Sequence, residues 1–286
     1  MPYPDDPSLR ADTLALLGGI WTRLPSAVER ARSWGADWFE VSTPFVHVEQ
    51  GRVVAHVGVL EIPFVLEGRP RTIAGIHAVC AHRDHRRRGH VRDLMERALA
   101  WIDERWETTV LWANDPGIYG RFGFVACEES IFVGSVRGGP ARSLRPLSLE
   151  RGEDVAFLSE RLARRAPVSS RVAVREPGWL ARIDLALWSP GPSLAYLPEL
   201  ECIVAYTLRE RFLDLYDVIG ERVPSLADLA ARLGSRIDTA VVHFSPDSLA
   251  APHLVAEPTV LIDDLMVRGP WTSTPDAFAV SPLGRC

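Results

Sequence analysis

The sequence contains no lysine: all 32 residues counted as lysine or arginine are arginines. Schiff-base chemistry and a lysine general base are therefore excluded. Basic residues do not dominate either, because 37 acidic residues give a formal net charge of −5, with a pI near 5.9. General nucleic-acid binding needs a basic surface, so we expect no nucleic-acid partner.

Cysteines and long apolar runs are also scarce. The four cysteines, Cys80, Cys127, Cys202 and Cys286, are scattered and form no C-x-x-C pair, which argues against a zinc site and for a reducing compartment. We expect no metal. No apolar stretch approaches the roughly 18 residues of a membrane span, and the sequence shows no secretory signal segment. We therefore expect a cytoplasmic protein without a membrane partner.

What the sequence does contain is an apolar strand joined to an amphipathic helix through a turn of arginine and glycine, over residues 79–92. We expect the strand over 72–82. The helix follows from apolar residues at i, i+3 and i+4 spacing. These residues are Val91, Leu94, Met95, Ala98, Leu99 and Ile102.

This turn has the properties of a phosphate-binding site. Gly89 lacks a Cβ, so the backbone can approach a ligand closely, and the N–H groups of the first helical turn have no intrahelical partners. Guanidinium groups add charge-assisted donors to the same place. They come from Arg86, Arg87, Arg88 and Arg92. The turn predicts a bound pyrophosphate, although a solvated basic helix start has the same composition.

The glycine spacing narrows the range of ligands that this turn could bind. It fits neither the G-x-G-x-x-G turn of dinucleotide folds nor the P-loop, so NAD and ATP are disfavoured. Arg86-x-x-Gly89 resembles the R/Q-x-x-G-x-G/A turn of the GNAT superfamily of acyl-CoA-dependent N-acyltransferases, with Val91 at the place of the third Gly or Ala. Residues 118–123 read I-Y-G-R-F-G. Together the two motifs resemble the Eis-like (enhanced intracellular survival) branch, with Arg83 replacing its usual proline.

The resemblance implies an α/β architecture, a mixed sheet with helices on both faces in the GNAT acyl-CoA N-acyltransferase fold. We expect a catalytic domain over 1–138, a linker over 139–150 and a degenerate second GNAT-like domain over 151–286. In the second half, Glu221 and Pro224 stand where an R-x-x-G turn would lie, and they disfavour phosphate. The first ten residues, with three prolines, are expected to form an unpacked tail. The third, sterol-carrier-like domain of the branch is not expected.

The resemblance also assigns residues to the acyl-CoA site. Backbone groups at the splayed end of the motif strand would bind the pantetheine arm, and first-turn N–H groups of the helix would bind the pyrophosphate. By position these are Val79, Cys80 and Ala81, and Gly89, His90 and Val91, with Asn114 and Asp115 as further contacts. Tyr119 matches the family's general acid, which protonates the departing thiolate. A turn-forming Asn114 and a merely packed Tyr119 are the alternatives.

The sequence signals for the general base and for the amine pocket are less specific. His77 and His82 lie on or beside the motif strand, but histidines there are commonly packed or solvent-facing. In Eis-like enzymes the terminal carboxylate acts as base, which here implicates Cys286, after a stretch from Phe278 that is apolar enough to pack. An acidic and aromatic group suits a cationic amine. It consists of Asp37, Trp38, Phe39 and Glu40.

The sequence thus predicts an acetyl-CoA-dependent N-acetyltransferase that transfers the acetyl group to a primary amine of a small molecule by direct attack in a ternary complex. The alternatives are a non-catalytic CoA-binding or regulatory module and an acyltransferase for a longer acyl-CoA. The amine is not identified. Homo-oligomerisation stays open.

Overall fold

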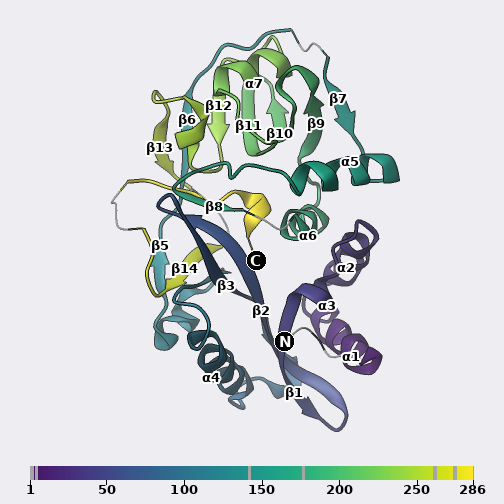
Figure 1. Ribbon diagram of the computed structural model, residues 1–286. Helices are drawn as coiled ribbons and strands as arrows, with labels where there is room; N and C mark the ends of the chain where they lie inside the picture. The colour runs from purple at the N-terminus through teal and green to yellow at the C-terminus, as the bar shows by residue number, and fades with distance from the viewer. Residues whose placement is uncertain are drawn as a thin grey trace.

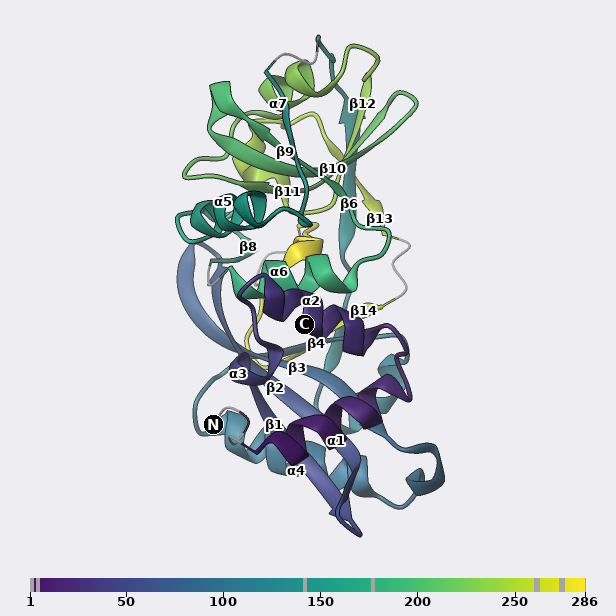
Figure 2. The same cartoon turned by 90° about the vertical axis from the view of Figure 1, so that its right-hand side faces the viewer.

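The chain folds into two β-sheets stacked end to end, with helices between and around them (Figures 1 and 2). The computed structural model describes residues 3, 6–140, 143–175, 178–259, 263–272 and 276–285. Figure 2 shows α6, α2 and the last helical turn of the chain in the layer between the sheets. In the described part of the chain, no helix is both long and apolar enough to cross a bilayer.

Each sheet is mixed and has seven strands within the described ranges. In spatial order, the first consists of β1 (Ser42–Glu49), β2 (Arg52–Leu66), β3 (Arg69–Ala81), β4 (Thr109–Ala113), β14 (Asp264–Arg268) and β5 (Val125–Cys127), with β8 (Val172–Val174) paired to β2. The second consists of β13 (Val255–Pro258), β6 (Ser130–Ser135), β12 (Thr239–Val242), β11 (Phe212–Ile219), β10 (Cys202–Arg209), β9 (Ser193–Leu197) and β7 (Arg145–Leu147).

Helices cover these sheets and connect their strands. The α-helices are α1 (Pro7–Gly18), α2 (Leu24–Ser33), α3 (Trp38–Val41), α4 (His90–Asp103), α5 (Gly152–Leu162), α6 (Trp179–Leu187) and α7 (Leu226–Leu233). Short 3₁₀ turns are η1 (Arg83–His85), η2 (Pro116–Ile118), η3 (Gly120–Phe122), η4 (Pro198–Leu200), η5 (Pro246–Leu249) and η6 (Pro282–Gly284).

The first sheet has helices on both faces, as expected. The apolar stripe of α4 is buried against one face, in a core with Val57, Ile76 and Leu111. Helices α1 and α2 belong to the core of the other face, which also contains Val53 and Cys80. Side chains on successive strand residues alternate between faces, so β3 supplies both cores. The expected α/β fold with a mixed sheet is confirmed.

The N-terminal residues differ from the expected loose tail. Tyr3 is only 3% exposed, and its backbone N–H donates to Phe39 O at 3.3 Å. Helix α1 already begins at Pro7, because Asp6 accepts hydrogen bonds from Ser8 N and Leu9 N as an N-cap. For these described residues the expectation of an unpacked tail is wrong, since prolines in the first helical turn favour a helix start.

Three strands pair with the other half of the chain, although the two halves were expected to fold separately. β6, from the segment 1–138, pairs with β12 and β13 in the second sheet. Conversely, two strands from the segment 151–286 belong to the first sheet. β14 lies between β4 and β5, and β8 pairs with β2. The expected linker contains β7, which pairs with β9. Strand pairing depends on partners far away in sequence, so the boundary between sheets does not follow a single cut in the chain.

Candidate active site

The turn between β3 and α4 leaves a helix N-terminus open to a ligand. Arg87 (φ +62°) and Gly89 (φ +88°) both adopt the left-handed conformation, which reverses the chain into α4. Gly89 is the N-cap, and no side chain caps the helix there. The free first-turn N–H groups and the helix dipole therefore favour an anion at this point.

A cavity of about 460 Å³ lies directly at this helix start. It is basic, because four of its lining side chains are arginines and none of the described lining residues is acidic. It also has an apolar wall suited to an extended organic chain. The lining residues are Val79, Ala81, His85, Arg86, Arg87, Gly89, His90, Val91, Arg92, Ile118, Tyr119, Arg121 and Phe122.

Strands β3 and β4 separate beside this cavity. Their parallel ladder includes only the pairs Ala74–Thr109 and Gly75–Val110, although both strands continue. The register of β3 against β2 also shifts between His56 and Gly58, opposite Ala78, which has φ +50°. A bulge of this kind bends a strand and re-aims its backbone groups. The last residues of β3 are thus held at the cavity without a β4 partner along their length.

Tyr119 faces the same cavity from the segment after β4. It lies between η2 and η3 and packs edge-on to Phe124 with 6.2 Å between ring centroids. Burial raises the pKa of the Tyr119 phenol to about 12, and the negative charge of Asp115 acts in the same direction. The phenol is therefore protonated at neutral pH and available as a proton donor.

The cavity contains most, but not all, of the residues predicted to bind the cofactor. Cys80 is only 7% exposed and points to the opposite core, where burial raises the pKa of its thiol to about 12. Arg88 turns toward Glu49, with 3.7 Å between Nη1 and Oε2. Asn114 and Asp115 are exposed and do not line the cavity. The Cys80 backbone remains part of the strand end, since only its side chain is turned away.

The histidines weighed as bases do not face the cavity. His77 Nε2 lies 2.8 Å from Ser42 Oγ, and burial lowers the pKa of His77 to about 3. Its neighbour His56 donates from Nδ1 to Ala78 O at 2.8 Å, so its Nε2 accepts from Tyr3 Oη at 2.5 Å. Burial lowers the pKa of His56 to about 4. Both are neutral core residues. His82 is exposed and pairs with Asp84.

The predicted amine pocket is not brought to this cavity. Asp37 caps α3 by accepting from Phe39 N at 2.9 Å, and Trp38 and Phe39 are buried in the core. Glu40 lines a separate hollow of about 280 Å³ together with Trp101, at the far end of α4. Ten residues of helix span about 15 Å, which separates Glu40 from the phosphate turn.

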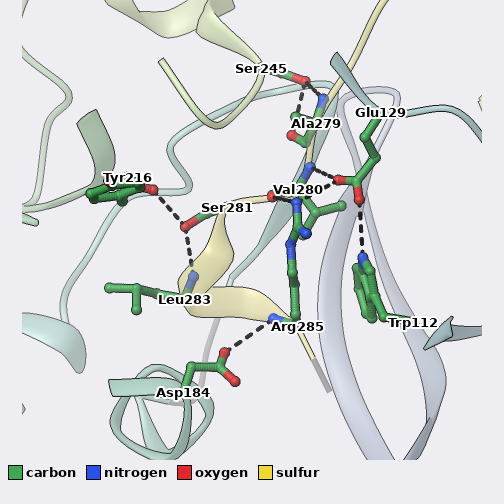
Figure 3. Close-up of polar contacts among 10 residues, drawn as sticks. All are labelled: Trp112, Glu129, Asp184, Tyr216, Ser245, Ala279, Val280, Ser281, Leu283 and Arg285. Carbon is green, nitrogen blue, oxygen red and sulfur yellow. Dashed lines mark hydrogen bonds and ion pairs between the residues drawn. The ribbon is translucent and has the colours of Figure 1, made fainter. Parts of the chain in front are cut away.

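The C-terminal segment packs between the two sheets, as its apolar character predicts (Figure 2). Figure 3 shows the polar contacts that it makes there. Glu129 accepts from Trp112 Nε1 (3.0 Å), from Val280 N (2.8 Å) and from Arg285 Nη2 (3.1 Å). Arg285 N also donates to Asp184 Oδ2 at 3.1 Å. Cys286, the predicted base, lies outside the described residues.

The second sheet has no comparable site among the residues described. There the N-terminus of α7 is closed, because Ser225 Oγ accepts from Asp228 N at 3.1 Å. The ladder of β11 with β12 ends at Leu215. Just beyond, Ser281 Oγ lies 3.0 Å from Tyr216 O and 2.7 Å from Asp217 Oδ2. The chain's own C-terminal segment thus occupies this strand end.

Sequence reasoning missed part of the cavity. Ile118, Arg121 and Phe122 belong to the I-Y-G-R-F-G motif, so the motif itself was a signal for them. His85 gave no signal beyond its place in the turn. Larger hollows of about 700 Å³ and 790 Å³ lie elsewhere. Both include acidic side chains, which makes them poorer phosphate sites.

Comparison with known proteins agrees with this fold. Residues 12–127 match the family model of the acetyltransferase (GNAT) domain. The chain therefore contains an acetyltransferase domain of the GNAT family. No protein of curated function matches the sequence significantly.

Solved structures extend the likeness to both sheets. A probable N-acyltransferase from Enterococcus faecalis V583 superposes with a TM-score of 0.62 at 15% identity, covering 91% of this chain and 70% of that one. Eis1 from Mycobacterium abscessus gives 0.60 at 17% identity, with 94% and 73% covered. A GCN5-related N-acetyltransferase from Anabaena variabilis ATCC 29413 gives 0.55 at 14%, with 94% and 72% covered. The expected tandem GNAT fold is confirmed.

Proposed function

We propose that this protein is an acetyl-CoA-dependent N-acetyltransferase that acts on a primary amine of a small molecule. The observation that carries the proposal is the basic cavity in which the uncapped start of α4, the free end of β3 and Tyr119 meet. Acyl transfer in general is supported by the GNAT domain of residues 12–127. The acetyl group and the small amine are our inference.

In this proposal the turn binds the pyrophosphate of acetyl-CoA. Backbone N–H groups of Gly89, His90 and Val91 donate to phosphate oxygens, and Arg86, Arg87 and Arg92 neutralise the charge. Val79 and Ala81 hold the pantetheine arm by backbone contacts in the manner of an added strand, as the separation of β3 from β4 allows.

The amine nitrogen attacks the thioester carbonyl directly, so the C–N bond forms as the C–S bond breaks. Tyr119 donates its phenolic proton to the departing thiolate. The ammonium formed by attack loses its proton to a base, which we assign to the terminal carboxylate of Cys286 or to a water. Of the four residues predicted to contact the amine, Asp37 caps α3 and Trp38 and Phe39 are buried in the core. Glu40 lines a separate hollow at the far end of α4. We therefore assign no residue to the amine.

Two measurements test this proposal, one of cofactor binding and one of turnover. Calorimetry with acetyl-CoA, CoA and NAD should give binding for the two CoA species alone. Release of free thiol from acetyl-CoA with a panel of amines, against octanoyl-CoA at equal concentration, should depend on the amine and favour acetyl-CoA. Binding without amine-dependent thiol release would make the protein a CoA-binding module. Preference for octanoyl-CoA would make it a longer-chain acyltransferase.

A further inference from the structure

A second cluster of chemically active side chains lies beside the phosphate turn, where the β1–β2 hairpin meets α4. His47 and Glu49 lie on β1, and His90 is the first residue of α4. One potential ligand atom from each of the three lies within 4.8 Å of the others. The cluster plays no part in the proposed acyl transfer, which uses only the backbone of His90.

The distances within this cluster fit ligands of one ion. Glu49 Oε1 lies 3.0 Å from His90 Nε2 and 3.6 Å from His47 Nε2. Two ligands at metal bonds of about 2.0 to 2.1 Å in tetrahedral geometry have their donor atoms about 3.3 Å apart. The two imidazole rings stack with 4.1 Å between centroids, so they present their edges to the same carboxylate.

His90 also has an unsatisfied nitrogen. Its Nε2 is buried and forms no hydrogen bond, although Glu49 is only 3.0 Å away. The carboxylate therefore lies at contact distance without the alignment of a hydrogen bond. A buried nitrogen of this kind is costly unless something binds it, and a metal ion held jointly with Glu49 would do so.

We propose that His47, Glu49 and His90 form a binding site for a divalent transition-metal ion, with zinc as the reference ion. Two imidazoles and one carboxylate suit zinc, cobalt or nickel, whereas magnesium and calcium prefer sites made of oxygen ligands. Three protein ligands leave a fourth position open to water or a ligand. Because His90 is the first residue of α4, the bound ion would link β1 to the end of the phosphate turn, where α4 begins.

The surroundings orient the carboxylate as an outer shell does around known metal sites. His85 Nδ1 lies 3.2 Å and Arg88 Nη1 3.7 Å from the other oxygen, Glu49 Oε2. These contacts leave Oε1 directed at the two ligand histidines. The expectation of no metal rested on the cysteines, and the spacing of His47, Glu49 and His90 in sequence forms no motif that would have revealed the site.

The test uses metal alone and does not depend on acyl transfer. Chelator-treated full-length protein is titrated with zinc chloride by calorimetry and with cobalt chloride by visible absorption. One ion per chain is expected, without the thiolate charge-transfer band that cysteine ligation would give. His47→Ala and Glu49→Gln should each weaken binding by more than about 100-fold, and His85→Asn by the roughly 10- to 100-fold typical of outer-shell partners.

His82→Asn is the matched control, since His82 lies in the same turn but outside the cluster, and it should bind as wild type. Circular dichroism confirms that each variant is folded. No binding of either ion, unchanged binding in both His47→Ala and Glu49→Gln, or a thiolate band would overturn the proposal.

Discussion

The hydroxyl of Ser281 lies 2.7 Å from the carboxylate of Asp217, at the point where β11 leaves its parallel partner β12. In the first sheet, β3 leaves β4 in the same way, but there a basic cavity of about 460 Å³ lies at the strand end. Two sheets of related topology thus differ at one place: one strand end is filled by the chain itself and the other is open to a ligand.

This difference predicts one CoA per chain. In the second sheet Ser225 closes the N-terminus of α7, and the segment containing Ser281 covers the strand end. A calorimetric titration with CoA should therefore give a stoichiometry of one. A second site of similar affinity would show that the C-terminal segment is displaced by ligand.

Gly89→Val should abolish CoA binding while the protein stays folded. A Cβ at Gly89 would meet no atom within 4 Å, so it would enter the open space in which we propose that the phosphate binds. The φ of +88° also strains any β-branched residue. Gly68→Val is the matched control, because Gly68 has φ +71° and equally open surroundings in the β2–β3 turn. Equal CoA affinities in the two variants by calorimetry would contradict the phosphate site.

The buried histidines predict a loss of stability in acid. Burial lowers the pKa of His56 to about 4 and that of His77 to about 3, from 6.5. The unfolded chain therefore binds more protons than the folded chain below pH 6.5, and stability falls as the pH drops from there toward 4 and then 3. Across its full window the loss should be roughly 3 kcal/mol for His56 and roughly 5 kcal/mol for His77.

Urea denaturation at pH 7.5, 6 and 5 measures this slope. A folded His77→Gln variant should show a shallower pH dependence than wild type, whereas the exposed His82→Asn change should leave the slope unaltered. A wild-type stability that is constant from pH 7.5 to 5 would mean that these histidines are already solvated or protonated in the folded protein.

The proposed carboxylate base is best tested by extending the chain. Removing the last three residues would also remove Arg285, the cation that pairs with the buried Glu129, and breaking such a pair costs about 3 kcal/mol or more. Appending two glycines after Cys286 keeps these contacts and moves only the carboxylate. Turnover should fall about 100-fold with unchanged CoA affinity and melting temperature. Unchanged turnover would assign proton removal to water.

Local sequence patterns predicted much of this fold. They failed where the structure depends on contacts between residues far apart in the sequence. The period of Leu94, Ala98 and Ile102 gave α4, and the arginine–glycine turn gave its uncapped start, because both depend on neighbouring residues. The exchange of β6 and β14 between the sheets was not predictable, since the sequence pattern of each strand would fit either sheet. Trp38 and Phe39 were predicted to line an amine pocket, but both rings pack against Tyr3. This burial depends on tertiary packing, which the local sequence does not reveal.

We propose that acyl transfer takes place at the cavity containing Tyr119, with the Tyr119 phenol as the proton donor. The most direct measurement is the rate of thiol release from acetyl-CoA, with a saturating amine, for wild type and Tyr119→Phe. The buried Tyr206→Phe serves as control. Loss of a positioned acid should lower kcat by about 100-fold or more with little change in acetyl-CoA affinity. Wild-type turnover in Tyr119→Phe would contradict the account and make Tyr119 a packing residue.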